Sequence, residues 1–137
     1  MRRLGSIFLL MLTGCQFSEN RHARRHIEPA ELIGVWQATE FAVKSLRDVG
    51  VREHLSTKEH ELTLRADGTC SMRTIMSMPD GFGDVDYRVY ENGCRWKIGE
   101  DGHQRLEFEL MPMPTRTPYY YLAEEDGNLL LWQYATD

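Results

Sequence analysis

Hydrophobic and polar residues alternate in short runs along most of this chain, and turn residues separate the runs. A period of two is typical of β-strands that have one buried and one exposed face. In the clearest run, Leu106, Phe108 and Leu110 alternate with charged residues. The pattern predicts an antiparallel all-β domain.

Eight strands are expected, and they follow one another through turns. Their approximate bounds are residues 32–43, 58–65, 69–77, 84–89, 94–98, 105–110, 119–123 and 129–134. The longer link over residues 44–57 has room for a short helix. Strands joined in this way close most simply into an eight-stranded antiparallel up-and-down barrel, because closure removes the free sheet edges. The interior of so small a barrel is either filled by side chains or holds one small ligand.

The turn at Asp67-Gly68 sets the register of the second and third strands. A three-residue loop over residues 66–68 pairs Leu64 with Cys70, whereas a two-residue loop pairs Leu64 with Ser71. The longer loop keeps apolar residues opposite each other, and it places glycine at the left-handed position. We therefore expect inward-facing side chains at three positions: Cys70, Met72 and Met76.

The N-terminus has the order of a targeting signal. Arg2 and Arg3 precede the apolar run of residues 7–12, which is too short to span a bilayer. The run ends in Leu12-Thr13-Gly14-Cys15, which resembles the lipobox of bacterial lipoproteins. An ordinary secretory signal, or a short helix that is retained, is the alternative.

The lipobox resemblance implies that residues 1–14 are a signal peptide and that Cys15 carries acyl chains such as palmitate. Each buried methylene contributes about 0.8 kcal/mol, so several chains anchor the protein at a membrane. Gln16 stands where aspartate favours the inner membrane in many Gram-negative lipoproteins. We therefore expect the periplasmic face of the outer membrane rather than the inner membrane.

Residues 15–29 are polar and are expected to form a flexible tether between the lipidated cysteine and a single domain over residues 30–137. The basic residues of this segment could touch anionic lipid, or the segment could simply be solvated. His22 and His26 have the spacing of a metal pair on a helix, but no third ligand lies near them in the sequence. Removal of residues 1–14 takes the net charge from −5 to −7, because this segment holds two arginines and no acidic residue.

Cys70 and Cys94 remain as a pair in a compartment where disulfides persist. A flat sheet would place them two strand spacings apart, about 9.6 Å, which is beyond the roughly 7 Å limit for a bridge. Curvature of the sheet, or an early end of the intervening strand at Asn92-Gly93, would remove this obstacle. We expect a Cys70–Cys94 disulfide, with two buried free thiols as the alternative.

Four short motifs resemble those of lipocalins and of small bacterial lipocalin-like domains. They are an entry turn over residues 29–33 followed by Gly34-Val35-Trp36, then Asp67-Gly68-Thr69, Gly93-Cys94-Arg95-Trp96 and Asp126-Gly127-Asn128-Leu129. The resemblance implies a lipocalin-like barrel over residues 30–137, with Gly34 and Trp36 as the barrel-closing residues. The chain departs from the family in having no arginine after Arg116 and no Thr-Asp-Tyr motif at the expected place.

Binding of a small apolar or amphipathic ligand is the first functional hypothesis. The expected contacts are side chains that would face the barrel interior near the loop of residues 79–83: Met72, Met76, Tyr87, Phe108, Tyr119 and Tyr121. The alternative is a solid core, in which these residues and the tryptophans Trp36, Trp96 and Trp132 only pack.

A barrel with a solid core could instead present a surface to another envelope protein, as an interaction or inhibitor module. Tyr119, Tyr120 and Tyr121 are consecutive, so one parity of this run must face outward, and Tyr120 is the candidate for that surface. The high β-propensity of tyrosine is the simpler explanation of the run. The negative net charge argues against a nucleic-acid partner, and we expect a monomer.

Catalysis is not expected, because the chain has no recognisable nucleophile motif, phosphate-binding glycine loop or dense set of metal ligands. No catalytic residue and no cofactor is therefore predicted. An acidic and histidine-rich group, formed by Glu53, His54, Glu59, His60 and Glu61, could hold a divalent cation. A flexible charged loop is the better interpretation of that group, and no metal site is predicted.

Overall fold

The computed structural model of the chain describes residues 2–3, 8–12, 22–23, 25–77, 85–114 and 117–134. Its elements are β1 (Arg2–Arg3), β2 (Phe8–Leu12), η3 (Pro29–Leu32), β3 (Gly34–Gln37), α1 (Glu40–Asp48), η4 (Thr57–Glu59), β4 (Glu61–Leu64), β5 (Cys70–Ser77), β6 (Val85–Tyr90), β7 (Cys94–Asp101), β8 (His103–Leu110), β9 (Tyr119–Glu125) and β10 (Asn128–Tyr134). The all-β prediction is confirmed, because each expected strand overlaps one of the strands β3 to β10.

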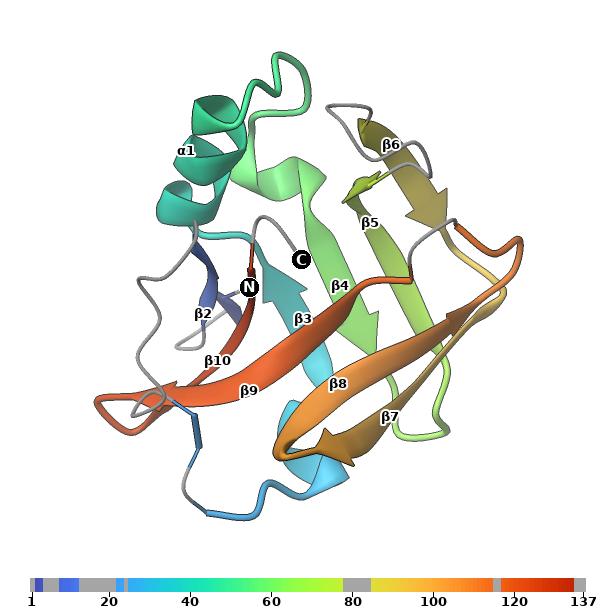
Figure 1. The fold of residues 1–137 in the computed structure, drawn as a ribbon. Helices are drawn as coiled ribbons and strands as arrows, with labels where there is room; N and C mark the ends of the chain where they lie inside the picture. The colour runs from blue at the N-terminus through green and yellow to red at the C-terminus, as the bar shows by residue number, and fades with distance from the viewer. Residues whose placement is uncertain are drawn as a thin grey trace.

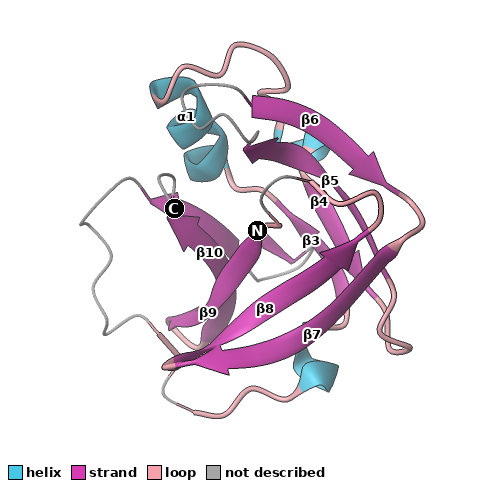
Figure 2. Ribbon diagram, turned by 45° about the vertical axis from the view of Figure 1, so that its right-hand side comes forward, coloured by secondary structure: helices cyan, strands magenta, loops and turns pink. Residues whose placement is uncertain are grey.

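Strands β3 to β10 form two antiparallel four-stranded sheets, in the orders β3-β4-β5-β6 and β10-β9-β8-β7. At the outer edges, β1 pairs with β3, and β2 pairs in parallel with β10. Figures 1 and 2 show β7, β8 and β9 lying across from β3, β4 and β5, with both sheets curved around a shared interior. Within the described residues no ladder joins β6 to β7 or β3 to β10, so the pairing does not establish the expected closed barrel.

The hairpin of β4 and β5 has the predicted register. Leu64 pairs with Cys70 and Leu62 pairs with Met72. Gly68 lies in the left-handed region at φ 84°, as the three-residue loop requires. Cys70, Met72 and Met76 are all buried, which confirms their predicted inward orientation.

The Cys70–Cys94 disulfide is present and joins the two sheets, with the two Cα atoms 5.0 Å apart. The last pair between β5 and β6 is Met72 with Tyr90, so β6 ends before it reaches Cys70. Beyond that end, Thr69 forms a β-bridge with Arg95 of β7. The early end of the intervening strand, which was one of the two expected routes, therefore brings the cysteines together.

Apolar side chains from both sheets meet in one core. Trp36 of β3 and Tyr120 of β9 are the largest fully buried side chains of this core. On β8, Leu106, Phe108 and Leu110 are buried, as their alternation predicts. Trp36 also donates from Nε1 to the carbonyl of Leu32 at 2.9 Å, which ties β3 to the turn of η3 that precedes it.

Residues 40–43, expected at the end of the first strand, are helical, so the predicted strand over residues 32–43 is too long. Thr39 is the N-cap of α1, and its hydroxyl accepts a hydrogen bond from the backbone N–H of Ala42 at 3.0 Å. Ala42, Val43 and Leu46 are buried at helical spacing. The cap and this spacing outweigh the β-propensity of Val43.

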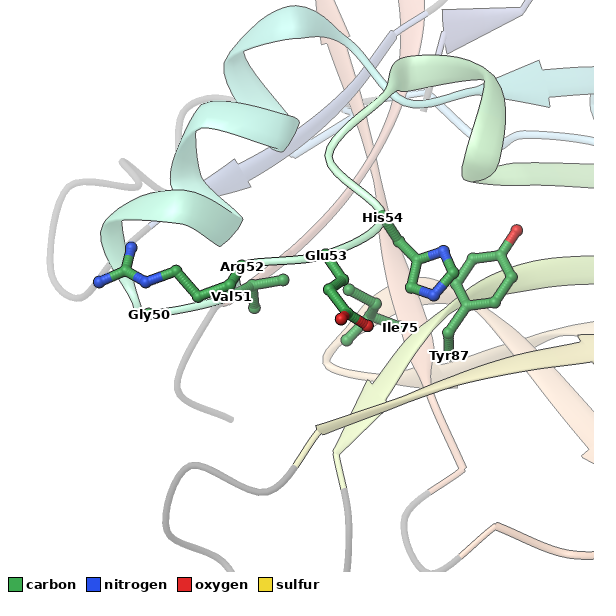
Figure 3. Close-up of a pocket in the computed structure, with 7 residues that line it drawn as sticks. All are labelled: Gly50, Val51, Arg52, Glu53, His54, Ile75 and Tyr87. Atoms are coloured by element: carbon green, nitrogen blue, oxygen red, sulfur yellow. The ribbon is translucent and has the colours of Figure 1, made fainter.

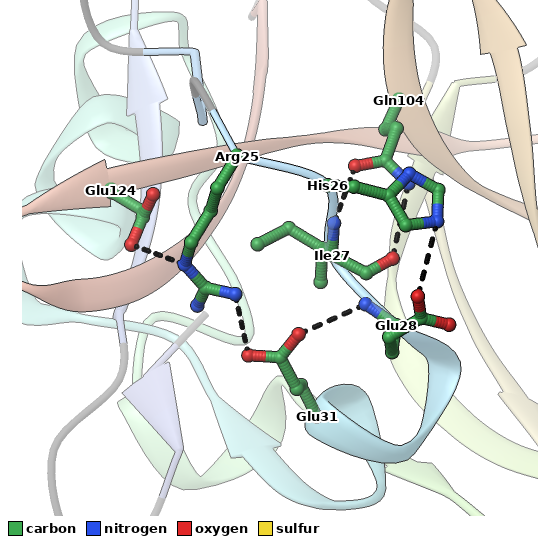
Figure 4. Close-up of polar contacts among 7 residues, drawn as sticks. All are labelled: Arg25, His26, Ile27, Glu28, Glu31, Gln104 and Glu124. Carbon is green, nitrogen blue, oxygen red and sulfur yellow. Dashed lines mark hydrogen bonds and ion pairs between the residues drawn. The ribbon is translucent and has the colours of Figure 1, made fainter.

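Part of the expected tether is held against the sheet instead of being free. Figure 4 shows residues 25–28, which we call the strap, next to Glu124 of β9 and Gln104 of β8. Ile27 is fully buried, its N–H donates to Gln104 Oε1 at 2.8 Å, and its carbonyl accepts from Gln104 Nε2 at 3.0 Å. Arg25 contacts Glu124 at 3.1 Å and Glu31 at 2.8 Å. The flexible tether predicted over residues 15–29 is therefore wrong for this segment, because one apolar side chain and one amide pair fix it.

Two further N-terminal expectations concern the membrane. Cys15, the expected lipidation site, and its neighbours in the lipobox from Thr13 onward lie outside the described residues. None of the helices in the described part of the chain has the length and apolar character needed to cross a bilayer.

Candidate functional site

The six side chains expected to line an internal ligand site do not lie on one side of the sheets. Met72, Met76 and Phe108 belong to the buried apolar cluster, where they pack against other side chains. Trp36 is buried in the same interior, and Trp96 is partly buried against it. Trp132 is buried on the other face of β10, beside the ring of Tyr121 at a centroid distance of 5.0 Å. The packing around Met72 and Phe108 favours the solid-core alternative for that part of the interior.

In β9 the residue that faces the interior is Tyr120, whereas a ligand site at Tyr119 and Tyr121 would require those two residues to face inward. Tyr120 is buried, and its ring packs edge-on against Phe108 with centroids 6.0 Å apart. Tyr119 and Tyr121 are partly exposed on the other face, where Arg105 lies 4.7 Å above the Tyr119 ring. The inward positions expected for Tyr119 and Tyr121, and the outward position expected for Tyr120, are therefore wrong. Aromatic residues occupy both parities of this strand, so its own pattern does not show which parity is buried.

Tyr87 of β6 also lies on the outer face. It pairs with Ile75, whereas Tyr90 is buried opposite Met72. Val89, which shares the face of Tyr87, is 55 % exposed. The expected interior position of Tyr87 is wrong, but its outer position places it at the edge of a pocket.

This pocket has a volume of about 440 Å³ and lies where the chain leaves α1 and passes the ends of β5 and β6 (Figure 3). Its lining comes from five consecutive residues and two strand residues: Gly50, Val51, Arg52, Glu53, His54, Ile75 and Tyr87. Val51 is buried and Ile75 partly buried, so together they form an apolar floor. A volume of this size falls within the range of small-ligand pockets, about 300–1,000 Å³.

His54 forms one wall of the pocket in a conformation that non-glycine residues rarely adopt. Its φ is 57°, in the left-handed region. Its carbonyl accepts a hydrogen bond of 2.6 Å from Nε2 of the buried His60. Its ring stacks on Tyr87 with centroids 3.9 Å apart and planes 6° from parallel. Backbone strain that is held by specific contacts is frequent at binding sites.

Tyr87 is held in place by a second contact. Its hydroxyl donates to the carbonyl of Glu59 at 2.6 Å. Glu59 in turn places Oε1 3.4 Å from Nδ1 of His54. Burial raises the pKa of the Tyr87 hydroxyl, so the group stays protonated and keeps this hydrogen bond at neutral pH. The aromatic wall made by His54 and Tyr87 is therefore fixed from both ends.

His60 supports the wall from inside the molecule. Because a carbonyl can only accept, Nε2 of His60 carries the proton that it donates to His54. Nδ1 of His60 then accepts from the hydroxyl of Thr74 at 3.0 Å. Burial lowers the pKa of His60 below its ordinary value of 6.5, although the bond to His54 opposes the shift. His60 is thus neutral at pH 7, with both nitrogens in use.

The acidic and histidine-rich group considered as a cation site is distributed around this wall. His60 has no free nitrogen for a metal, since one bonds His54 and the other Thr74. Glu61 forms an ion pair with Arg73 at 3.5 Å on β5 instead. The described part of the chain contains no set of three metal-ligating side chains close enough to hold an ion.

A second depression, of about 620 Å³, lies on the outer face of β4, β5 and β6. Three of its charged lining residues interact with neighbouring side chains: Arg73 with Glu61 at 3.5 Å, and Arg65 with the hydroxyl of Ser71 at 2.5 Å. Tyr87 borders this groove as well as the pocket. Because the pocket has an apolar floor and a strained wall, we take the pocket as the candidate site.

The chain and its fold match no protein-family model, no curated protein and no solved structure. The functional assignment therefore rests on the geometry of the pocket. Of the residues expected to bind a ligand, Tyr87 alone lines it, while Gly50, Val51 and Ile75 had no signal of their own in the sequence. The acidic and histidine-rich group pointed to this part of the chain, but for a different chemistry.

Proposed function

We propose that the protein is an envelope lipoprotein, anchored through acyl chains on Cys15, whose β domain binds a small apolar or amphipathic ligand rather than catalysing a reaction. The observation that carries the binding proposal is the wall of His54 and Tyr87, which His60 and Glu59 fix above an apolar floor. Such a pocket offers a ligand an apolar floor and two charged side chains, Arg52 and Glu53, among its lining residues. We therefore propose a ligand site on the outer face of the domain instead of in its interior.

The binding proposal is tested with two matched substitutions on the same face of one sheet. Ile75→Ser removes part of the pocket floor, whereas Val89→Ser changes an exposed aliphatic residue outside the pocket. NMR titration of the full chain with short amphiphiles should shift the signals of Ile75 and Tyr87. Ile75→Ser should weaken the titration and Val89→Ser should not. Shifts confined to residues outside the pocket would contradict the proposal.

The anchor is tested by Cys15→Ala. We expect this variant to lose labelling by a palmitate analogue and to leave the outer-membrane fraction, because no acyl chain is attached. Persistence of the Cys15→Ala protein in that fraction would contradict the lipid anchor without bearing on the pocket.

We further propose that the domain over residues 30–137 closes into the eight-stranded lipocalin-like barrel once residues 1–14 are removed. Support comes from β1 and β2, which occupy the free edges of β3 and β10 and belong to the segment that lipoprotein processing removes. Hydrogen exchange tests this proposal. The amides of β10 should be protected in the processed protein by pairing with β3, and fast exchange there would contradict closure.

A second candidate function, binding of another envelope protein, is favoured by the outer face of β8 and β9. Tyr119 and Tyr121 lie there with rings 5.5 Å apart, and Arg105 stacks on Tyr119. Tyrosine and arginine are enriched at the energetic centres of interfaces. A photo-crosslinker at Tyr121 should capture an envelope protein, and one at the exposed Glu109 of the same sheet should not.

A further inference from the structure

The two charged residues at the rim of the pocket differ from most charges around the site because neither is neutralised internally. Within the part of the chain that the structure describes, Arg52 and Glu53 form no ion pair and no hydrogen bond through their side chains. Glu59, by contrast, contacts His54, and Glu61 pairs with Arg73. Arg52 and Glu53 are thus available to a ligand.

These two side chains point in different directions. Figure 3 shows the Glu53 carboxylate directed toward Ile75, between Val51 and the His54 ring, whereas the Arg52 guanidinium extends away from the aromatic wall. A ligand that lies on the apolar floor therefore meets a carboxylate before it meets a guanidinium. The interior of the pocket is anionic even though its rim carries one charge of each sign.

The aromatic wall bounds the pocket on the other side of this carboxylate. The His54 ring stacks on Tyr87 and lies between Tyr87 and the Glu53 carboxylate, so a ligand on the floor meets the wall through His54 (Figure 3). Tyr87 is held by its hydrogen bond to Glu59, so the wall costs little ordering on binding. Arg73 pairs with Glu61 and not with Glu53.

We propose that the pocket takes a small amphipathic amine, with its ammonium group against Glu53 and its apolar part on Val51 and Ile75. This inference rests on the proposed ligand-binding function and specifies the ligand class of the same site. A carboxylate at the edge of an apolar floor selects against anionic amphiphiles, because like charges repel and the guanidinium of Arg52 extends away from the aromatic wall.

The test uses three ligands that share one apolar chain and differ only in head-group charge: octylammonium, octanol and octanoate. Calorimetry on the full chain should find octylammonium bound about two- to fivefold tighter than octanol, the range of an exposed ion pair. Octanoate should bind more weakly than octanol. Higher ionic strength should bring the affinities of octylammonium and octanoate closer to that of octanol.

Two neighbouring substitutions distinguish the rim charges. Glu53→Gln should weaken octylammonium about two- to fivefold and leave octanol unchanged. Arg52→Gln, the matched control one residue away, should not weaken octylammonium. Both residues are exposed, so both variants should keep the wild-type circular dichroism spectrum.

Each other outcome has a definite meaning. If octanoate binds tightest and Arg52→Gln abolishes that preference, the amine inference is overturned while ligand binding at the pocket stands. If octylammonium binds equally well to Glu53→Gln, the carboxylate does not select the ligand and the inference is again overturned. If none of the three amphiphiles binds, the proposed ligand-binding function fails, and the amine inference fails with it.

Discussion

The strap of residues 25–28 and the rim of the pocket are both short polar segments, yet the structure uses them in different ways. In the strap, Arg25 lies between Glu31 and Glu124, and Ile27 exchanges two hydrogen bonds with Gln104 (Figure 4). At the rim, Arg52 and Glu53 have no such partners among the described residues. The polar groups of the strap are thus paired with other parts of the protein, whereas the two charges of the rim are not.

This difference separates structural charge from charge that is available for binding. A polar segment whose groups are all matched gains little from a ligand, because binding would have to replace contacts that already exist. Charged side chains without a partner in the protein, next to an apolar floor, can bind a ligand without first breaking an internal contact. The comparison predicts that changes in the strap affect stability, whereas changes at the rim affect binding.

The largest expected effect is on the buried side chain of the strap. Ile27→Ala should lower the free energy of unfolding by about 2–5 kcal/mol, since it opens a cavity under a fully buried side chain. Urea denaturation measures the change. Val89→Ala is the matched control, and at 55 % exposure it should cost less than about 0.5 kcal/mol. Equal effects of the two substitutions would mean that the strap is not part of the folded core.

A smaller effect is expected from the support of the pocket wall. His60→Leu leaves the carbonyl of His54 and the hydroxyl of Thr74 without their partners, and it should cost about 1–3 kcal/mol. The same variant should lose the ring-current shifts of the Tyr87 protons as His54 leaves its stacked position. His26→Gln, at an exposed histidine of the strap, should change neither quantity. A His60→Leu protein that retains the stack would show that other contacts hold His54.

The pH dependence of stability should also reflect His60. Its pKa in the folded protein lies below the ordinary value of 6.5, so the unfolded chain binds more protons between these two values. Stability should therefore be full above pH 6.5 and should decline as the pH falls through this window. Urea midpoints measured at about pH 7.5, 6.5 and 5.5 test this. Each unit by which the folded pKa of His60 lies below the unfolded pKa corresponds to about 1.4 kcal/mol of stability lost at low pH, which such midpoints resolve. The decline should be shallower in His60→Leu, and equal slopes would contradict the assignment.

The smallest effect is expected from the exposed charges of the strap. Arg25→Gln removes the contacts to Glu31 and Glu124, but its side chain is half exposed and solvent screens both pairs. The loss of stability should be slight and should disappear in high salt. A large loss that persists in high salt would mean that Arg25 fixes the strap more strongly than Ile27 does.

Several features of the fold could be predicted because they depend on local patterns. The alternation of Leu106, Phe108 and Leu110 identified the buried face of β8, and Gly68 in its three-residue loop set the pairing of Leu64 with Cys70. The cysteine pairing followed from strand order and from the turn at Asn92-Gly93. In each case a period of two or a required backbone conformation leaves one arrangement that keeps apolar residues together.

Other features depended on partners that are distant in the sequence. Tyr119, Tyr120 and Tyr121 offer an aromatic side chain at every position, and Tyr120 is the one that joins the core cluster formed by both sheets. The strap is held by Gln104, 77 residues from Ile27, and the ring of the left-handed His54 stacks on Tyr87 of a different segment, β6.

Short-range alternation and turn chemistry therefore account for most of the strand positions, for the hairpin register and for the disulfide of this protein. Tertiary contacts account for the outward aromatic face, for the docked strap and for the pocket between the end of α1 and the edge of β6. The physical reason is that burial is shared between segments far apart in the chain, and a local pattern carries no information about its distant partner.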